Sequence, residues 1–407
     1  MLLGSLIDLL KLLEKSQSIM VAQLHQFCEI NTGTYNLNGL KMMHQTLKSI
    51  FIPLADSVET RTFKKITTIN MAGEKEFHQS GDGLLIRKRP HLKRRVLLCG
   101  HMDTVYSETN PFKQLRYLNN NHIIGPGVAD MKGGLIVMLH ALMAFEKTPF
   151  SESMGWDVFI NADEEIGSPA SSEVFKEIAK NYQCALVFEP AMTESGKLAK
   201  NRKGSGKVTL IATGKAAHAG RAFDKGHNAI CYLAEVITAI NTLNGKRPGV
   251  TINIGKIAGG EALNVVPEKA VAKIDIRISQ PEDEKWVRDE FAAILNQHKR
   301  KGFNLVIDGN FGRPVKRVDK STEILFKKIQ WLGKELNISI DWEDSGGCCD
   351  GNNLASLGLP VLDTLGVRGG EIHSSKEYLV MDSLVERASL NALLLVDLAQ
   401  GGLEELR

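Results

Sequence analysis

Residues 96–104 read Val-Leu-Leu-Cys-Gly-His-Met-Asp-Thr, a short apolar run that ends in a glycine, a histidine and an aspartate. Such a run, bounded by a turn residue, predicts a buried strand. Polar residues that follow a strand lie at its carboxyl end, where open parallel sheets bind ligands. His101 is therefore predicted to enter a site, and Asp103 could accept its second ring N–H. Taken alone, a His-x-Asp pair is more often a turn with a capping aspartate.

The flanking sequence alternates buried strands with helices. Trp156–Asn161 and Cys184–Phe188 are predicted strands, and Leu135–Phe145 and Ser172–Tyr182 are predicted helices between them. Pro360–Leu365, far along the chain, has the pattern of a further strand. This alternation predicts an α/β domain with a mainly parallel, doubly wound sheet covered by helices on both faces.

The middle of the chain has a different pattern, in which strands and helices follow the order βαββαβ. The predicted strands are 207–215, 250–257, 270–278 and 305–308, and the predicted helices are 228–243 and 282–298. This order is ferredoxin-like. We therefore expect an inserted domain at 203–312 between two parts of the α/β domain, 1–202 and 313–407.

Composition limits the possible functions. The chain has 407 residues, a formal net charge of only +3 and 43% hydrophobic residues, which is typical of a globular protein without a bulk-charge attraction to nucleic acid or membrane surfaces. The longest apolar run, Leu135–Phe145, is too short to span a bilayer. The first residues lack a basic start and include Asp8 within the apolar stretch, so a cytoplasmic location without a signal peptide is expected.

Four more segments carry residues that can bind cations. Asp130 lies in the glycine-rich stretch 125–134, Glu164 and Glu165 follow the strand at 156–161, Glu189 follows the strand at 184–188, and His373 follows Gly369-Gly370. Each has a plainer interpretation, since Asp130 could cap a helix and the acidic residues could form a solvated loop. Together, the two histidines and three of these carboxylates, Asp130, Glu165 and Glu189, suit a pair of divalent cations, and zinc, cobalt and manganese all tolerate such ligands.

Six motifs connect the chain to a known family. They are GHMDTV, GVADMKGG, DEEIGS, FEPA, GKAAHAG and GGEIHS, in this order. In these motifs the chain resembles the zinc-dependent peptidases and deacylases that include glutamate carboxypeptidase, acetylornithine deacetylase, succinyl-diaminopimelate desuccinylase and aminoacylase. The resemblance covers nearly the whole chain and is strongest to glutamate carboxypeptidase.

The resemblance implies a ligand set for two metal ions. His101, Asp130 and Glu189 would hold one ion. Asp130, Glu165 and His373 would hold the other, so that Asp130 bridges the pair.

The resemblance also implies catalytic roles. Glu164 would be the general base toward a hydroxide that bridges the metals, and Asp103 would orient His101. His218, in the inserted domain, would stabilise the oxyanion in the active site of a neighbouring subunit, which makes the inserted domain a dimerisation and lid domain and the protein a homodimer. Relatives often have a cis peptide after the bridging aspartate, here Asp130–Met131.

The expected substrate is a small peptide or N-acyl amino acid with a carboxylate next to the scissile amide. Lys197, Asn264, Arg277 and Arg313 match positions that bind substrate in glutamate carboxypeptidases. Arginine suits this role because its planar fork matches both carboxylate oxygens. Without the resemblance, Arg277 would be read as an exposed strand residue.

Two alternatives remain open. The first is a deacylase of the acetylornithine or succinyl-diaminopimelate type, and the second is a non-catalytic binding protein on the same fold. The loop Cys348-Cys349-Asp350 departs from the family pattern, because Cys349 replaces a small hydroxyl residue beside the expected substrate pocket. The presence of every expected ligand and of Glu164 disfavours the non-catalytic reading.

Overall fold

The structure, a computed structural model, describes residues 2–406 and the side chains of residues 7–406. The chain divides into two compact units. The first unit contains the N-terminal residues up to 65, then 79–201, then 316 to the C-terminal end, and the second contains 66–78 and 202–315.

The first unit is built on a six-stranded sheet in the order β1-β4-β8-β5-β9-β18. Its strands are β1 (Ser57–Arg61), β4 (Gly83–Lys88), β5 (Arg95–His101), β8 (Gly155–Asn161), β9 (Cys184–Val187) and β18 (Val361–Leu362). Strands β8, β5, β9 and β18 are parallel, as predicted. Strand β4 runs antiparallel to β8, and β1 antiparallel to β4, so the sheet is mixed.

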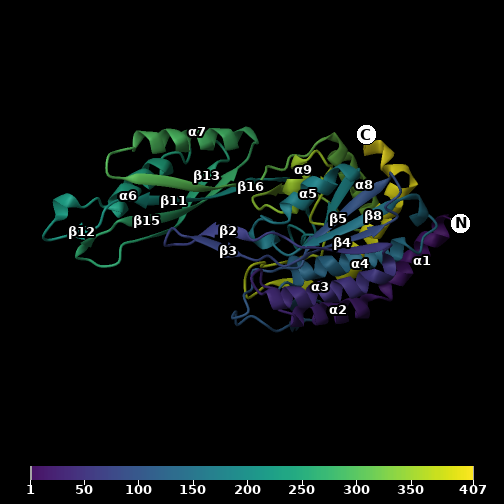
Figure 1. Cartoon of the computed structure of the whole chain (residues 1–407). Coiled ribbons are helices and arrows are strands. Elements are labelled where there is room, and N and C mark those ends of the chain that lie inside the picture. The colour runs from purple at the N-terminus through teal and green to yellow at the C-terminus, as the bar shows by residue number, and fades with distance from the viewer. Residues whose placement is uncertain (1, 407) are drawn as a thin grey trace. The chain divides into compact units, whose positions relative to one another are not determined.

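Alternating side chains of β5 pack into different cores on the two faces of the sheet. Val96 and Leu98 belong to a large core with the helices α1, α2, α3, α4, α8 and α10, whereas Leu97 and Cys99 face a smaller core with α5 and α9. Figure 1 shows α2, α3 and α4 below the sheet and α5 and α9 above it. The sheet is therefore covered on both faces, as the doubly wound pattern predicts.

The helices of this unit are α1 (Leu2–Glu14), α2 (Gln17–Glu29), α3 (Leu37–Phe51), α4 (Gly134–Phe145), α5 (Ser172–Ile178), α8 (Lys320–Glu335), α9 (Asp350–Ser356) and α10 (Asp382–Asp397). Small sheets are formed by β6 (Arg116–Asn119), β7 (His122–Ile124), β19 (Gly369–Gly370) and β20 (Tyr378–Val380), and by β10 (Leu198–Arg202) with β17 (Trp342–Ser345).

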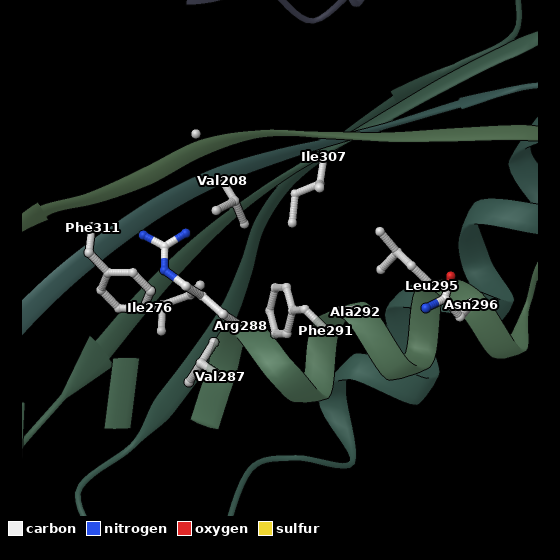
Figure 2. Close-up of a pocket in the computed structure, with 11 residues that line it drawn as sticks. Val208, Ile276, Val287, Arg288, Phe291, Ala292, Leu295, Asn296, Ile307 and Phe311 are labelled. Atoms are coloured by element: carbon white, nitrogen blue, oxygen red, sulfur yellow. The ribbon is translucent and has the colours of Figure 1, made fainter. Parts of the chain in front are cut away.

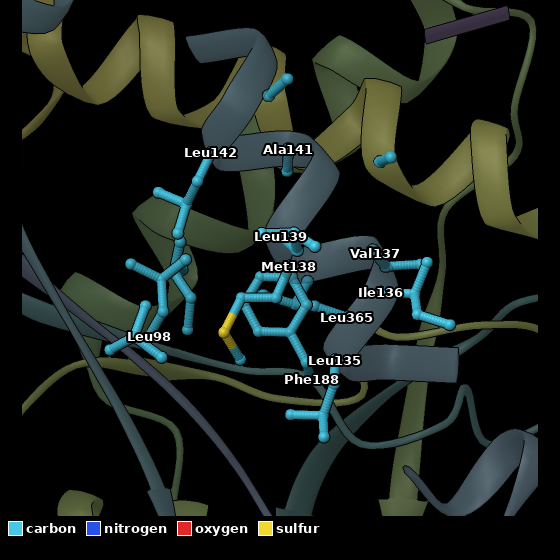
Figure 3. Packing of buried hydrophobic residues seen from close by; sticks show 14 of the residues in the cluster. Leu98, Leu135, Ile136, Val137, Met138, Leu139, Ala141, Leu142, Phe188 and Leu365 are labelled. Atoms are coloured by element: carbon cyan, nitrogen blue, oxygen red, sulfur yellow. The ribbon is translucent and has the colours of Figure 1, made fainter. Parts of the chain in front are cut away.

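Helix α4 lies at the centre of the large core. Figure 3 shows its side chains packed together with Leu98, Phe188 and Leu365 in this core. Among the described residues, Val128–Phe145 is the one helical stretch long and apolar enough to cross a membrane by length and composition, and 94% of it is buried inside the protein. Its apolar character is accounted for by this central position.

The second unit has the βαββαβ order that the sequence predicts. Its elements are β11 (Gly204–Thr213), β12 (Ala217–His218), α6 (Ala229–Asn241), β13 (Thr251–Gly259), β14 (Val265–Val266), β15 (Lys269–Ile278), α7 (Glu282–Gln297) and β16 (Asn304–Arg313). The sheet order is β13-β15-β11-β16 with antiparallel neighbours, and α6 and α7 cover one face (Figure 1).

A hairpin of β2 (Ile66–Ile69) and β3 (Lys75–His78) also belongs to the second unit, although its sequence lies outside the predicted 203–312 segment. At its turn, a Cβ on Gly73 would meet Ile211 and Val271, which point away from the two helices. The hairpin therefore covers the second face of the sheet. This contact joins segments more than a hundred residues apart, so local patterning does not reveal it.

A cavity of about 360 Å³ lies between α7 and the sheet of the second unit (Figure 2). Phe291 and Ala292 of α7 and Ile307 and Gly309 of β16 are among its lining residues. Arg288 lies over the ring of Phe311 at 5.3 Å and pairs with Glu284.

Candidate metal centre

Neighbouring strands deliver the charged side chains to one edge of the first unit's sheet. His101 ends β5, Glu164 and Glu165 follow β8, and Glu189 follows β9. Because β8, β5 and β9 are adjacent and parallel, their carboxyl ends lie side by side. The order of the strands places the histidine between the two groups of carboxylates.

Two loops complete the cluster. Asp130 lies in an irregular turn before α4, and its peptide bond to Met131 is cis, as the resemblance implies. His373 lies in the loop between β19 and β20 with a φ of 62°, in the left-handed region that side chains rarely adopt. The backbone at both positions departs from regular structure where the side chains converge.

Asp130 lies between the two histidines. Its Oδ1 is 3.2 Å from His101 Nε2, and its Oδ2 is 3.2 Å from His373 Nε2. Glu189 Oε1 lies 3.7 Å from His101 Nε2, and Glu165 Oε2 lies 3.2 Å from His373 Nε2. Each half of the cluster thus contains one histidine, one glutamate and one oxygen of a shared aspartate.

The chemistry of these donors fits divalent cations. Ligand atoms of His101, Asp130 and Glu165, and those of His101, Glu164 and Glu189, lie within 4.8 Å of one another. Within the described part of the chain, Glu165 Oε1 is buried and has no hydrogen-bond partner. Buried carboxylates at this density repel one another, and imidazole and carboxylate ligands suit zinc and similar ions.

The electrostatics of the cluster reflect the same crowding. Burial, together with the charge of Asp130, raises the pKa of Glu165 to about 7. Hydrogen bonds to Asp130 and Glu165 raise the pKa of His373 to about 11. Burial would lower the pKa of His101, but the charge of Glu189 and hydrogen bonds to neighbouring carboxylates outweigh it and hold the pKa well above its usual value. Protons therefore neutralise part of the excess negative charge.

Asp103 contacts His101 and also supports the neighbouring turn. His101 Nδ1 lies 2.9 Å from the main-chain oxygen of Asp103 and 3.5 Å from its carboxylate. The carboxylate also accepts hydrogen bonds from the backbone N–H groups of Glu164 and Glu165, each at 3.2 Å, and from Thr34 Oγ1 at 2.8 Å. Its side chain thus fixes the turn that carries the two glutamates.

Asp163 is structural. It is fully buried, and its Oδ2 accepts the N–H groups of Ala170 and Ser171 at 2.7 and 3.1 Å. Burial raises its pKa to about 6. The run of three acids in the sequence therefore divides into one residue that shapes the loop and two that face the centre.

Glu377 supports the Asp130 loop and was not anticipated from the sequence. Its fully buried carboxylate accepts the N–H groups of Gly127, Ala129 and Asp130 at 3.1, 2.9 and 3.0 Å, and the hydroxyl of Tyr106 at 2.6 Å. A lone glutamate in Lys376-Glu377-Tyr378 carries no motif, so nothing in the local pattern indicated this role.

Cys349 caps a helix. It is buried, it is the N-cap of α9, and its thiol accepts the N–H of Gly351 at 3.3 Å. The next residue, Asp350, accepts hydrogen bonds from Asn161 at 2.8 Å and Ser168 at 2.5 Å. The thiol thus fills the capping position of a small hydroxyl residue.

Of the four predicted substrate residues, Lys197 belongs to the first unit. Its ammonium group lies 2.9 Å from Glu343 Oε2, and this carboxylate raises the pKa of Lys197. Both partners are about two-fifths exposed, so the pair is accessible to solvent.

Arg277 and Arg313, in the second unit, both pair in register with Ser205 on the central strand β11. Three adjacent strands therefore place them in one row. Arg313 is buried, and Arg277 lies 2.7 Å from Asp275.

Asn264 and His218 are also brought together in the second unit. The carbonyl of Asn264 accepts the N–H of Ala219 at 2.9 Å, and His218 pairs with Val265. Nδ1 of His218 accepts the N–H groups of Gly220 and Arg221, both at 3.1 Å. In the neutral ring the proton then lies on Nε2, which becomes a hydrogen-bond donor to solvent or ligand.

Comparisons with known proteins agree with the fold. Residues 201–302 match the Peptidase dimerisation domain of the M20 type. The chain is 27% identical over 387 residues to carboxypeptidase G2 from Pseudomonas sp. (strain RS-16), which covers 95% of this chain and 90% of that protein. It is 29% identical over 330 residues to a succinyl-diaminopimelate desuccinylase from Psychrobacter sp. (strain PRwf-1), which covers 75% and 80%.

A solved structure has the same architecture. An M20 family metallo-carboxypeptidase from Sulfolobus solfataricus matches with a TM-score of 0.71 at 15% identity, covering 94% of this chain and 99% of that one. The fold and the homologues define an amide hydrolase. These similarities, in the dimerisation domain and in both homologues, are to the M20 peptidase family, as the motifs predict.

Replacing Glu377 tests its support of the Asp130 loop. We expect Glu377→Ala to lower the zinc content per chain and to destabilise the fold, because each buried N–H that loses its acceptor costs about 1–3 kcal/mol. Glu377→Gln keeps one acceptor oxygen and should retain more metal. Glu335→Ala, at an exposed position of α8, is the control. Elemental analysis and thermal unfolding are the measurements, and wild-type zinc content in Glu377→Ala would contradict the role.

Metal uptake should depend on pH. The raised pKa values mean that the metal-free protein carries protons on His373 and, below about pH 7, on Glu165. Coordination displaces these protons, so the apparent affinity should rise from about pH 6 to about pH 8. Competition with a chromophoric chelator measures the affinity, and calorimetry in two buffers measures the protons released. An affinity that does not change over this range would contradict the assignment.

Proposed function

We propose that this protein is a two-metal amide hydrolase that removes a C-terminal acidic residue from a small peptide or N-acyl conjugate, in the manner of a glutamate carboxypeptidase. The observation that carries the proposal is the placement of Asp130, with one carboxylate oxygen 3.2 Å from each of His101 and His373. A shared carboxylate is what a pair of metal ions needs to lie close together.

In this proposal His101, Asp130 and Glu189 hold one ion, and Asp130, Glu165 and His373 hold the other. Zinc is the proposed metal, and cobalt and manganese suit the same ligands. Such ions, when bound, lower the pKa of a water molecule and polarise the scissile carbonyl.

Glu164 is the proposed general base. It lies beside the ligand set, is nearly buried, and its backbone N–H is held by Asp103. Its carboxylate would take the proton of the attacking water and pass it to the leaving amine. The same Asp103 carboxylate also accepts the backbone N–H of Glu165, so the general base Glu164 and the metal ligand Glu165 are held in fixed positions relative to each other.

His218 is the proposed donor to the oxyanion of the tetrahedral intermediate. The two N–H groups that bind its Nδ1 leave Nε2–H to donate, which is the tautomer that this role requires. We propose that it serves the partner subunit of a homodimer. The match to a peptidase dimerisation domain supports this assembly.

The substrate's terminal carboxylate is assigned to Arg277 and Arg313, with Asn264 and Lys197 as further contacts. The row formed with Ser205 supports a shared anion site for the two arginines. The homologue named carboxypeptidase G2, which aligns over most of both chains, supports an acidic leaving residue. A cytoplasmic location is proposed as well.

The desuccinylase homologue supports a second candidate, a deacylase of N-acyl amino acids. The two candidates differ in the residue that leaves. A carboxypeptidase should hydrolyse N-acylglutamates, whereas a deacylase should prefer N-acetylornithine or N-succinyl-diaminopimelate.

Replacing Glu164 tests the division of labour between the adjacent glutamates. We expect Glu164→Ala to keep its metal content and to lose about two to four orders of magnitude in the hydrolysis rate of an N-acylglutamate. Glu165→Ala should lose metal. Elemental analysis and rate measurements on both variants decide the matter. Equal loss of metal in Glu164→Ala would show that the two roles are exchanged.

A heterodimer tests whether His218 acts across subunits. One chain carries Glu164→Ala and the other His218→Ala, and two affinity tags isolate the mixed dimer. If His218 serves the partner, one of the two centres is complete, and about half of the wild-type rate should return. If His218 acts in its own subunit, both centres are defective. A mixed dimer as slow as the single variants would therefore refute the cross-subunit role.

A further inference from the structure

A pocket of about 410 Å³ adjoins the candidate metal centre within the first unit. We call it the Tyr35 pocket. It is lined by the loop 33–36, by residues 104, 105 and 107–109 after β5, and by Glu165 and Ile166. Glu165 connects it to the centre, since its Oε2 lies 3.2 Å from His373 Nε2. Its volume is within the range of small-molecule sites.

The pocket is held open by hydrogen bonds between its two loops. The N–H of Thr104 binds the carbonyl of Thr32 at 2.8 Å, and the N–H of Thr34 binds the carbonyl of Thr104 at 3.2 Å. Asn31 Nδ2 donates to the carbonyl of Tyr106 at 3.0 Å. These contacts fix the walls without a ligand, so the shape of the pocket can select among substrates.

Apolar side chains are exposed in this pocket. Tyr35 is 60% exposed and Val105 is 41% exposed, and Ile166 is half-buried beside them. Binding of a ligand that covers these apolar groups is favourable, because it removes apolar surface from water. The pocket therefore favours an apolar group on the substrate.

The charged residues of the lining disfavour the binding of negatively charged acyl groups in the Tyr35 pocket. None of the described residues that line the pocket is lysine, arginine or histidine, and Glu108 is part of the lining, between Ser107 and Thr109. A carboxylate in the pocket would find no lysine, arginine or histidine in the lining and would be repelled by Glu108. Anionic acyl groups are therefore disfavoured.

We infer that the Tyr35 pocket binds an uncharged, apolar acyl group of the substrate, because its lining offers no cationic side chain to the acidic leaving residue. This inference rests on the proposed function, which places the scissile amide at the metal centre. It selects against succinyl and other dicarboxylic acyl groups. It thus distinguishes this protein's substrates from those named for its desuccinylase homologue.

The test uses three conjugates of one leaving group: N-hexanoyl-, N-acetyl- and N-succinyl-L-glutamate, with the zinc-loaded full-length protein. We expect kcat/KM for the hexanoyl compound to exceed that for the acetyl compound by at least about tenfold, because buried methylenes add binding free energy. The succinyl compound should be the poorest of the three. A succinyl compound that equals or exceeds the hexanoyl one overturns the inference and leaves the proposed function standing.

Substitutions in the Tyr35 pocket test whether its residues cause the preference among acyl groups. Tyr35→Ala should reduce the hexanoyl-to-acetyl ratio several-fold, whereas Tyr117→Ala, an exposed tyrosine of β6 outside the pocket, should leave the ratio unchanged. Glu108→Lys should raise the succinyl-to-acetyl ratio by about tenfold. Ratios that remain at the wild-type values in both pocket variants would contradict the inference.

Measuring the binding of the conjugates tests the pocket independently of the hydrolysis reaction. Calorimetric titration of the Glu164→Ala variant with each conjugate gives affinities without turnover. The order hexanoyl, acetyl, succinyl in affinity supports the pocket even if the wild-type protein hydrolyses none of them, a result that would refute only the proposed reaction. Absence of binding by all three refutes the pocket assignment as well.

Discussion

The carboxylate of Asp130, positioned between His101 and His373, is the interaction on which the site depends. Its two oxygens face two imidazoles at equal distances, so it joins two groups of ligands into one cluster. A shared carboxylate can bridge two cations only if its loop is held rigidly. The buried Glu377 supplies that support by accepting three backbone N–H groups of the loop.

The fold explains why the other ligands meet there. Strands β8, β5 and β9 are adjacent and parallel, and each ends next to a residue of the cluster. The side chain of Asp103 connects the ends of β5 and β8 by binding the backbone of Glu164 and Glu165. The parallel sheet thus sets the position of each charged group, and buried carboxylates set its orientation.

Much of this architecture could be predicted from the sequence. Local periodicity identified the parallel strands and the βαββαβ insertion, and motif order identified the cluster that the structure brings together. Contacts between distant segments could not be read in this way. The antiparallel strands β1 and β4, the hairpin at 66–78 and Glu377 depend on such contacts, as Glu377 lies 247 residues from Asp130. The sequence predicts a contact between the Asp103 carboxylate and His101. In the structure this contact is 3.5 Å long, and the main-chain carbonyl of Asp103 lies nearer to His101 Nδ1, at 2.9 Å.

The most direct measurement of the central claim is anomalous diffraction at the zinc edge from crystals of the zinc-loaded protein. Two peaks are expected on either side of the Asp130 carboxylate, one next to His101 and Glu189 and the other next to His373 and Glu165. A single peak that leaves Asp130 uncoordinated, or peaks only elsewhere on the chain, would contradict it.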